Sequence, residues 1–181
     1  YLNRGNLEFK DVTGISGTGG DFRWMLGSTV CDVNEDGLLD IYVSVSGLKS
    51  NCRNLLFVNK GNNPEGIPLF KEEAAKYGID DNGKSSQTTF FDYDNDGDLD
   101  LYVANYPITR FKSSPYFYRQ MMNNAKIDES GHLYRNNGDG TFTNVASEVG
   151  LTVDSFIKGA DWGDYNNDGR IDLYVSNDGT A

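Results

Sequence analysis

The sequence has 181 residues, and its 27 Asp and Glu against 16 Lys and Arg give a formal net charge of −11. Such an acidic chain is a poor partner for nucleic acid, because the phosphates repel it. Hydrophobic residues make up 38% and aromatic residues 13% of the chain, which is enough for a packed core. No apolar run is long enough to predict a membrane-spanning helix.

The net charge is concentrated in three windows of nine residues. They read Asp32-Val-Asn-Glu-Asp-Gly-Leu-Leu-Asp40, Asp92-Tyr-Asp-Asn-Asp-Gly-Asp-Leu-Asp100 and Asp164-Tyr-Asn-Asn-Asp-Gly-Arg-Ile-Asp172. Together the windows hold 12 acidic residues and one basic residue, whereas the rest of the chain holds 15 of each. Carboxylates crowded in this way raise each other's pKa or recruit cations.

Each acidic window belongs to a longer repeated unit. A strand pattern follows each window directly, at residues 41–45, 101–104 and 173–176. A second shared piece predicts a hairpin closed by Asn, Asp and Gly; it begins at residues 1–5, 57–61 and 134–138 and leads to Phe9, Phe70 and Phe142. In the second and third units, residues 72–77 and 144–149 are expected to form one helical turn that stops at Gly78 and Gly150.

Four short strands in each unit, recurring after 60 and then 72 residues, are typical of a β-propeller with enlarged blades. We therefore predict an all-β fold in which residues 1–181 form one partial propeller, with repeat units near 1–46, 54–104 and 133–176. The chain would start at the third strand of one blade, run through two whole blades and stop after the second strand of another. Because three blades cannot close a ring, the remaining blades are expected from unseen sequence or from another chain.

The acidic windows carry the oxygen ligands that Ca²⁺ prefers. A tight turn supplies several oxygens to one ion when alternate residues point inward, and the glycine at position 6 permits the sharp reversal. The predicted ligands are the side chains at positions 1, 3, 5 and 9 and the carbonyl at position 7. They are Asp32, Asn34, Asp36, Leu38 and Asp40; Asp92, Asp94, Asp96, Asp98 and Asp100; and Asp164, Asn166, Asp168, Arg170 and Asp172. Three Ca²⁺ sites are expected, and the second window, with four ligand carboxylates, should bind most tightly.

Three alternatives to a calcium-binding turn require different residues in or near the windows. An EF-hand requires a bidentate Glu at position 12 between two helices, whereas Val43, Val103 and Val175 stand there within predicted strands. Zinc or copper would call for His or Cys ligands, of which the chain has one and two. The alternative that remains is an ordinary Asp/Asn/Gly hairpin turn without metal.

These residues resemble the FG-GAP/VCBS repeat of integrin α-subunit-like β-propellers, and most closely the propellers of secreted proteins related to cartilage acidic protein, often found with an ASPIC/UnbV domain. The stretches that carry the resemblance are Phe90-Phe-Asp-Tyr-Asp-Asn-Asp-Gly-Asp-Leu-Asp-Leu-Tyr-Val103, Trp162-Gly-Asp-Tyr-Asn-Asn-Asp-Gly-Arg-Ile-Asp-Leu-Tyr-Val175 and Leu133-Tyr-Arg-Asn-Asn-Gly-Asp-Gly-Thr-Phe142. The resemblance implies a seven-bladed ring, calcium in the turns between the first and second strands of a blade, and an interaction role outside the cell or at its surface.

Other motifs give weaker signals. Residues 78–85 spell the phosphate-loop pattern, but a strand is predicted to follow where that motif needs a helix, and Asp80 and Asp81 would repel an anion, so no nucleotide is expected. His132 is the sole histidine, and its spacing from any acid indicates no role beyond packing or solvent contact. Cys31 and Cys52 are expected to be free thiols.

The segment 106–130 departs from the repeat and from the acidity of the chain. It joins the second strand of a blade to the third, so it should emerge on the face opposite the acidic turns. Its basic and aromatic residues predict contact with a protein or glycan, with a loop packed on its own small core as the alternative. The candidate contact residues are Tyr106, Arg110, Phe111, Lys112, Tyr116, Phe117, Tyr118 and Arg119.

The function that we expect is that of a calcium-stabilised, non-catalytic interaction module. Because extracellular calcium would saturate even sites of modest affinity, we expect an extracellular, secreted or cell-surface location, which includes association with an outer membrane. We also expect a signal peptide in a longer precursor. Two alternatives remain open: the carbohydrate-binding part of a polysaccharide-active enzyme, and a subunit of a larger cell-surface assembly that completes the ring.

Overall fold

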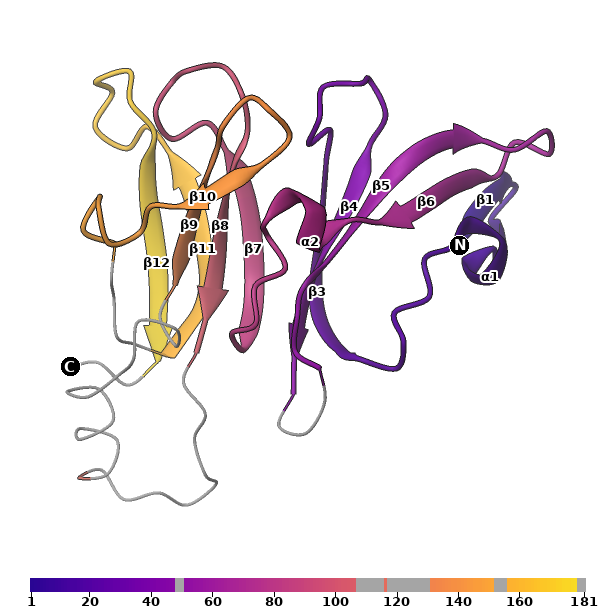
Figure 1. Cartoon of the computed structure of the whole chain (residues 1–181), viewed down its shortest axis with the longest axis horizontal. Helices are drawn as coiled ribbons and strands as arrows, with labels where there is room; N and C mark the ends of the chain where they lie inside the picture. The colour runs from indigo at the N-terminus through magenta and orange to yellow at the C-terminus, as the bar shows by residue number, and fades with distance from the viewer. Residues whose placement is uncertain (48–50, 107–115, 117–130, 152–155, 179–181) are drawn as a thin grey trace.

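The protein was analysed as a computed structural model that describes residues 1–47, 51–106, 116, 131–151 and 156–178. Strands and two short helices make up its regular structure (Figure 1). In chain order the elements are β1 (Leu2–Gly5), β2 (Glu8–Lys10), α1 (Thr13–Ser16), β3 (Trp24–Cys31), β4 (Asp40–Ser46), β5 (Leu55–Asn62), β6 (Pro68–Glu72), α2 (Ala74–Tyr77), β7 (Ser85–Phe91), β8 (Asp100–Asn105), β9 (His132–Asn136), β10 (Phe142–Asn144), β11 (Phe156–Gly163) and β12 (Asp172–Asp178). None of the described helices is long and apolar enough to cross a membrane.

The strands form small antiparallel sheets in the order of the chain. Strands β3-β4-β5-β6 make one four-stranded sheet and β7-β8-β9-β10 another, while β1-β2 and β11-β12 are two-stranded. This arrangement matches the predicted succession of half a blade, two whole blades and half a blade, and it confirms a mostly β fold. Closure of these sheets into a ring stays a prediction.

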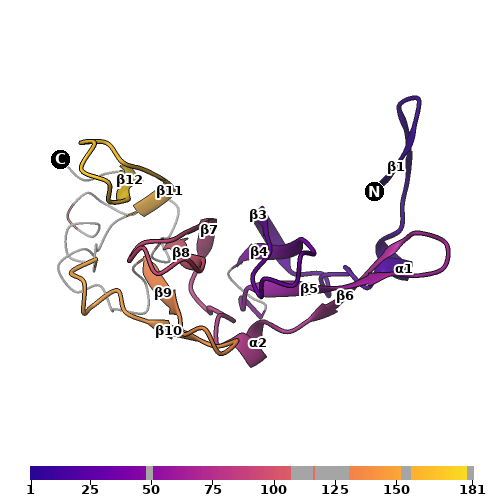
Figure 2. The ribbon, with the colours of Figure 1, turned by 90° about the horizontal axis from the view of Figure 1, so that it is seen from above.

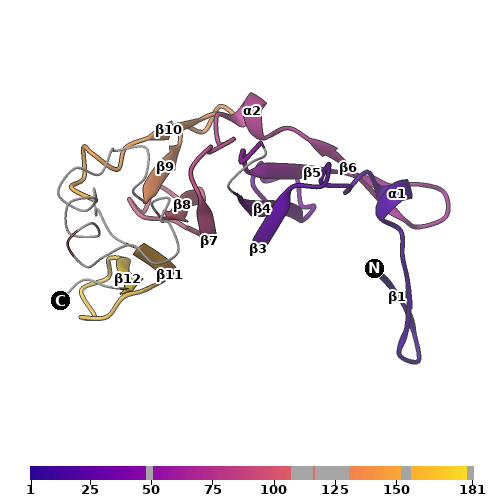
Figure 3. The ribbon, with the colours of Figure 1, turned by 90° about the horizontal axis from the view of Figure 1, so that it is seen from below.

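The sheets follow one another along an arc. Figures 2 and 3 show β3 and β7 on the concave side of the arc, with β10 on the outer side. The hairpin β1–β2 lies at one end and the pair β11–β12 at the other. Neighbouring sheets contact each other through their first strands, β3 with β7 and β7 with β11.

Apolar side chains fill the spaces between successive sheets. The cluster between the two four-stranded sheets contains Tyr42 and Leu56 from one side and Phe90 and Leu101 from the other. The Tyr42 and Phe90 rings meet edge to face with their centroids 5.9 Å apart. A second cluster joins β8 and β9 to β11, with Ile157 fully buried. The core is therefore made by contacts between repeats, as in other repeat architectures.

The glycines that end α1 and α2 are favoured by close packing as well as by their backbone conformation. The predicted helical turn at residues 72–77 is confirmed as α2, which ends at Gly78 with φ of 75°. A Cβ on Gly78 would lie 3.2 Å from the Phe142 carbonyl oxygen. In the third unit β10 extends to Asn144 and residues 146–150 form a turn, with one helical hydrogen bond from the Val149 amide to the Val145 carbonyl oxygen at 3.1 Å. The first unit has a helix, α1, that sequence reasoning missed. There Gly17, with φ of 77°, would place a Cβ 2.8 Å from the Phe70 carbonyl oxygen.

The segment 78–85 is a connection that leads into β7 and not into a helix, which agrees with the exclusion of a phosphate loop. Both cysteines are buried thiols, as expected, and the Cys52 sulfur lies 3.0 Å from the Gly47 carbonyl oxygen and 2.8 Å from the Lys84 ammonium.

The prediction for His132 is wrong. Its Nδ1 lies 2.5 Å from an oxygen of Asp81, and both side chains are buried. The same carboxylate accepts hydrogen bonds from the Tyr134 hydroxyl at 2.8 Å and the Gly83 amide at 2.7 Å. Burial acts to raise the pKa of Asp81, but the hydrogen bond and charge of His132, together with the amide and hydroxyl donors, outweigh it and leave the pKa below its ordinary value. The partners lie 51 residues apart, so local spacing could not indicate the pair.

Asp81 also joins a polar network that ties β7 and β8 to the segment before β5. Asn105 donates from its amide to Asp81 at 3.2 Å and accepts from the Ser85 hydroxyl at 2.8 Å. Asn54 in turn donates to the Ser85 hydroxyl at 2.8 Å. Since all these side chains are buried and partnered, the network fixes how one four-stranded sheet sits on the next.

Removing the Asp81 carboxylate should therefore destabilise the fold. We expect Asp81→Ala to cost about 3 kcal/mol of unfolding free energy, because it removes the buried acceptor that His132, Tyr134 and the Gly83 amide share. Asp80→Ala is the matched control, since the neighbouring Asp80 pairs with the half-exposed Arg53 at the surface, and it should cost less than about 1 kcal/mol. Urea denaturation measures both values, and equal losses would contradict the role assigned to Asp81.

Glu73, just before α2, is the centre of a second charged group. Its side chain is 6% exposed and lies 2.7 Å from the Lys71 ammonium, 3.0 Å from that of Lys60 and 3.7 Å from that of Lys76. The hydrogen bond from Lys71, with further contributions from Lys60 and Lys76, outweighs burial and lowers the pKa of Glu73 to about 2. The carboxylate therefore stays ionised in the folded protein at moderately acid pH.

This shift predicts a defined acid dependence of stability. The ordinary pKa of 4.5 applies to the unfolded chain, so the stabilisation by Glu73 is complete above that pH and is lost as the pH falls towards 2. Because the three lysines are exposed and screened, we expect a contribution of about 1 kcal/mol. Urea denaturation of the wild type and Glu73→Gln at several pH values should show a gap that closes over this range. A gap that stays constant would contradict the assignment.

Candidate metal centre

The three acidic windows occupy equivalent places in the fold. Each connects the first strand of a sheet to the second, as β3 to β4, β7 to β8 and β11 to β12. Figure 1 shows the three connections at the same end of the strands. The first Asp of each window follows the end of the first strand, and the ninth residue begins the second. Val43, Val103 and Val175 lie within β4, β8 and β12, which confirms that these loops are not EF-hands.

The first aspartate of each window shapes the turn. Asp92 accepts hydrogen bonds from the amides of Asp96 and Gly97 at 3.1 and 3.0 Å. Asp32 and Asp164 accept from the fifth and sixth residues of their own windows in the same way. The fourth residue takes a left-handed conformation, with φ of 57–59°, and the glycine at position 6 has φ of 83–102°. The sequence pattern therefore specifies one backbone turn in three copies.

The ninth aspartate anchors the turn to the sheet. Asp40 and Asp100 are fully buried. One oxygen of each accepts from the amide of the second window residue, at 3.0 Å in both cases. The other oxygen accepts from the third strand of the sheet, from the Asn59 amide at 2.7 Å and the Asn136 amide at 2.8 Å. The equivalent Asp172 accepts from the Tyr165 amide at 3.0 Å.

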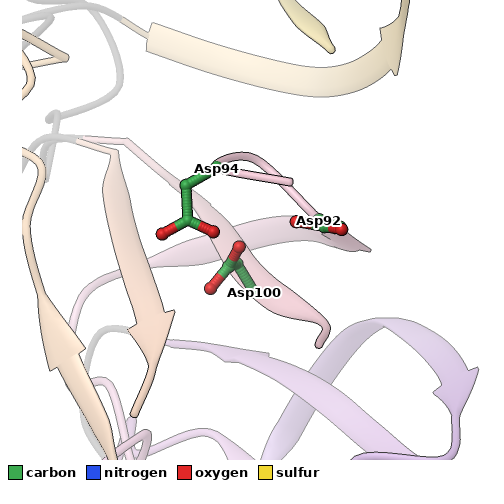
Figure 4. A group of neighbouring side chains, drawn as sticks. All are labelled: Asp92, Asp94 and Asp100. Atoms are coloured by element: carbon green, nitrogen blue, oxygen red, sulfur yellow. The ribbon is translucent and has the colours of Figure 1, made fainter. Parts of the chain in front are cut away.

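In the second window the carboxylates converge. Oxygens of Asp92, Asp94 and Asp100 lie within 4.8 Å of one another, and Figure 4 shows their side chains turned towards a common space. Among the described residues no other group of three acidic, His or Cys side chains meets this distance. Three carboxylates at such spacing are ligands of the kind that Ca²⁺ prefers, and they supply part of the six to eight oxygens that it takes.

The electrostatics of the second window also fit a cation. Burial raises the pKa of Asp100 to about 6, against the hydrogen bonds from the Tyr93 and Asn136 amides. Burial and the charges of Asp96 and Asp94 raise the pKa of Asp98 to about 6. One oxygen of Asp98 is buried without a hydrogen-bond partner. A divalent cation would relieve this repulsion and stabilise the ionised carboxylates, so the residues present fit such an ion.

The first and third windows differ from the second at position 3. Asn34 and Asn166 stand there, and each donates from its side chain to the fifth residue, to Asp36 at 3.0 Å and to Asp168 at 3.1 Å. Their side-chain oxygens also accept from the amides of Asp36 and Asp168. The side-chain amides of Asn34 and Asn166 thus stand where the second window has the Asp94 carboxylate. The side chains keep the predicted oxygen atoms close together but carry less charge.

Three of the predicted ligands are brought together by the structure, namely the side chains of Asp92, Asp94 and Asp100. The amides of Leu38, Asp98 and Arg170 donate to the fifth residue of their own window, at 2.9, 3.1 and 2.9 Å. Their role as carbonyl ligands stays a prediction, as do the three expected ions.

Sequence reasoning missed two parts of this site. It assigned only the carbonyl of Asp98, whereas the side chain adds a further carboxylate beside Asp94 and Asp96. It also missed the backbone amides of Asn59 and Asn136 that hold the ninth aspartate. The asparagine shared by the hairpin motifs was the available signal, because it marks where the third strand meets the window.

The candidate contact segment is described only in part. Arg110, Phe111, Lys112, Phe117, Tyr118 and Arg119 lie outside the described residues. Tyr106 follows β8, at the end of that strand away from Asp100, and its hydroxyl lies 2.9 Å from that of Ser46. The Lys158 ammonium lies 5.7 Å from the centre of the Tyr106 ring, and Tyr116 is 71% exposed. Tyr106 therefore links neighbouring sheets, and a partner contact at these residues stays a prediction.

A shallow cavity of about 380 Å³ lies where β7 meets the last pair of strands. Polar and small residues line it: Gln87, Thr89, Gly159, Ala160, Asp161, Tyr174 and Ser176. Tyr174 is 64% exposed, so an aromatic face is open to solvent beside hydrogen-bonding groups.

The convergence of carboxylates predicts that the second window binds a trivalent or divalent ion most tightly. Position 2 of the second and third windows is a tyrosine, Tyr93 or Tyr165, whose ring can sensitise the luminescence of bound Tb³⁺. The equivalent residue of the first window, Val33, cannot sensitise it. We expect Asp94→Asn to weaken the tightest Tb³⁺ site about tenfold, because it removes a converging charge. Glu35→Gln removes one charge at a position that is not a ligand and should leave the tightest site unchanged. Equal effects of the two variants would show that only net charge matters.

Comparison with known families agrees with this geometry. Residues 123–175 match the family described as FG-GAP-like repeat. The match includes β9, β10, β11 and the third acidic window. Comparison with curated proteins gives no significant match. The stretch 123–175, with its hairpin, connection and acidic turn, is therefore an FG-GAP-like repeat.

Proposed function

We propose that the chain is a calcium-stabilised segment of a β-propeller that serves as a non-catalytic interaction module outside the cytoplasm, secreted or at the cell surface. The observation that carries the proposal is the convergence of Asp92, Asp94 and Asp100 in a turn whose backbone recurs in three copies. FG-GAP repeats typically bind Ca²⁺, which supports the same conclusion. Extracellular calcium is abundant enough to fill sites of modest affinity.

The ion would have a structural role in this proposal. Asp92 holds the amides of the turn, and Asp100 joins the turn to β8 and β9 through backbone hydrogen bonds. Bound Ca²⁺ supplies positive charge between these carboxylates. Because the folded turn positions the ligands and the unfolded chain does not, binding adds to the free energy of unfolding.

The partner in this proposal is a protein or a glycan on the face opposite the acidic turns. Tyr106 lies at that end of β8, and the segment that follows it carries basic and aromatic residues suited to such contacts. Nucleic acids and nucleotides are not expected as partners, because the acidic chain would repel their phosphates.

A carbohydrate-binding role is the second candidate, favoured by the cavity between β7 and β11–β12. Its exposed Tyr174 offers a ring face for a sugar, and Gln87 and Asp161 offer hydrogen-bonding groups. Binding to a glycan panel that Tyr174→Ala abolishes would favour this candidate over a protein-binding module.

The calcium proposal predicts a specific thermal stabilisation. We expect Ca²⁺ to raise the Tm by roughly 5 °C or more over the chelated protein, and Mg²⁺ at matched ionic strength to raise it much less. Differential scanning calorimetry measures both shifts. Equal Tm shifts with Ca²⁺ and Mg²⁺, or no shift with either ion, would show that the acidic windows are ordinary turns without a specific calcium site.

A pair of variants assigns the shift to the second window. Asp92→Asn should remove most of the Ca²⁺-dependent shift, because it weakens both the turn and the ligand set. Asp139→Asn alters an exposed hairpin aspartate outside the windows and should keep the full shift. Loss of the shift in both variants would contradict the assignment.

A further inference from the structure

Lys84 and Cys52 meet where the two four-stranded sheets adjoin. Cys52 lies between β4 and β5 of the first sheet, and Lys84 immediately precedes β7 of the second. The Lys84 ammonium lies 2.8 Å from the Cys52 sulfur. Cys52 is 9% exposed and Lys84 is half-buried. An amine and a thiol, both nucleophiles, are thus in direct contact at the junction between two complete sheets.

The distance between this nitrogen and this sulfur is short for a hydrogen bond. N–H···O hydrogen bonds span about 2.7–3.2 Å, and sulfur is a larger atom than oxygen. The Cys52 thiol donates its own proton to the Gly47 carbonyl oxygen at 3.0 Å, so the side of the sulfur that faces Lys84 carries a lone pair. A single oxygen atom bonded to both nitrogen and sulfur would hold them at nearly this separation.

Hydrogen bonds fix the chain next to both residues. Two residues after Cys52, the Asn54 side chain donates to the Ser85 hydroxyl at 2.8 Å, and Ser85 directly follows Lys84. The Lys84 carbonyl oxygen accepts from the Tyr106 amide at 3.1 Å. Because Asn54 and Ser85 are buried, the interior of the protein holds this arrangement. The amine and the thiol are therefore positioned before any reaction, which lowers the entropy cost of joining them.

We propose that Cys52 and Lys84 form a reversible covalent N–O–S link, with dioxygen as the oxidant. The Lys84 ammonium first gives one proton to solvent. The S–H bond of Cys52 and one N–H bond of the neutral amine then break, and one oxygen atom becomes bonded to both sulfur and nitrogen. The second oxygen atom leaves as water with the two hydrogens. Sulfur and nitrogen each lose two electrons and dioxygen gains four, so the step balances.

Reducing thiols reverse this step. Two molecules of dithiothreitol supply four electrons and are oxidised to disulfides, while the link returns to a thiol, an amine and one water. The link thus differs from the sulfinic and sulfonic acids of more strongly oxidised cysteine, which thiols do not reduce. The oxidised and reduced forms of the protein can therefore interconvert.

The link joins the two sheets across their junction. It closes a loop of the chain between residues 52 and 84, and it lies beside the hydrogen bond between Asn54 and Ser85 that already bridges the sheets. A cross-link restricts the unfolded chain far more than the folded one, so it adds to the free energy of unfolding. Oxidation therefore determines how firmly one sheet is held on the next. This redox control goes beyond the proposed function and does not depend on bound Ca²⁺.

Mass spectrometry of the 181-residue chain, kept in air-saturated buffer with chelator and then denatured, tests the link. We expect a mass about 14 Da above that of the reduced chain, because one oxygen is gained and two hydrogens are lost, and dithiothreitol should remove the increase. Lys84→Arg keeps a positive charge beside the sulfur but lacks the amine, so it should abolish the increase. Cys31→Ser is the matched control: it removes the other thiol, which lies at the end of β3 beside Asp32 and Asp40, and it should keep the increase.

Calorimetry in the same buffer measures what the link does. The linked protein should melt roughly 5 °C above the same protein in dithiothreitol, whereas Lys84→Arg should melt at one temperature in both conditions. A chain that stays reduced in air would overturn the inference, as would a mass increase that Lys84→Arg retains. A cross-link with a loss of about 2 Da would be a direct S–N bond and would contradict the bridging oxygen. Because both measurements are made in chelator, failure of the calcium proposal would leave this inference intact.

Discussion

The ninth aspartate of the acidic windows, which is fully buried in the first two, is the constraint on which the rest of the structure depends. Asp40 and Asp100 start the second strand of a sheet, accept the amide of the acidic turn and accept an amide from the third strand. One carboxylate thus connects a turn and two strands. Since a buried carboxylate without donors is strongly destabilising, the turn and the third strand must both be present.

The same constraint explains why the acidic charge is concentrated. The turn that precedes the ninth aspartate places further oxygen atoms beside its carboxylate. In the second window the carboxylates of Asp92, Asp94 and Asp100 converge in this way. Burial raises the pKa of Asp98 and Asp100 to about 6, so the cluster costs free energy unless a cation offsets it. In the proposed function, bound Ca²⁺ would offset the repulsion among these carboxylates and stabilise the folded protein.

Stability is also shared between neighbouring repeats. Tyr42 packs on Phe90 across two sheets, and Asp81 holds His132 and Tyr134 of the second sheet while Asn54 and Ser85 extend the network towards the first.

The sequence by itself determined the repeats, the strands beside each acidic window, α2 with its Gly78 end, and the turn itself, because these depend on residues close together in the chain. It also indicated the FG-GAP-like resemblance, which the match at residues 123–175 confirms. Only the tertiary structure decided that Asn59 and Asn136 hold the ninth aspartates and that the sole histidine binds Asp81. These contacts join residues 19 to 51 positions apart, and strand pairing and packing within and between sheets bring them together, so no local pattern could specify them.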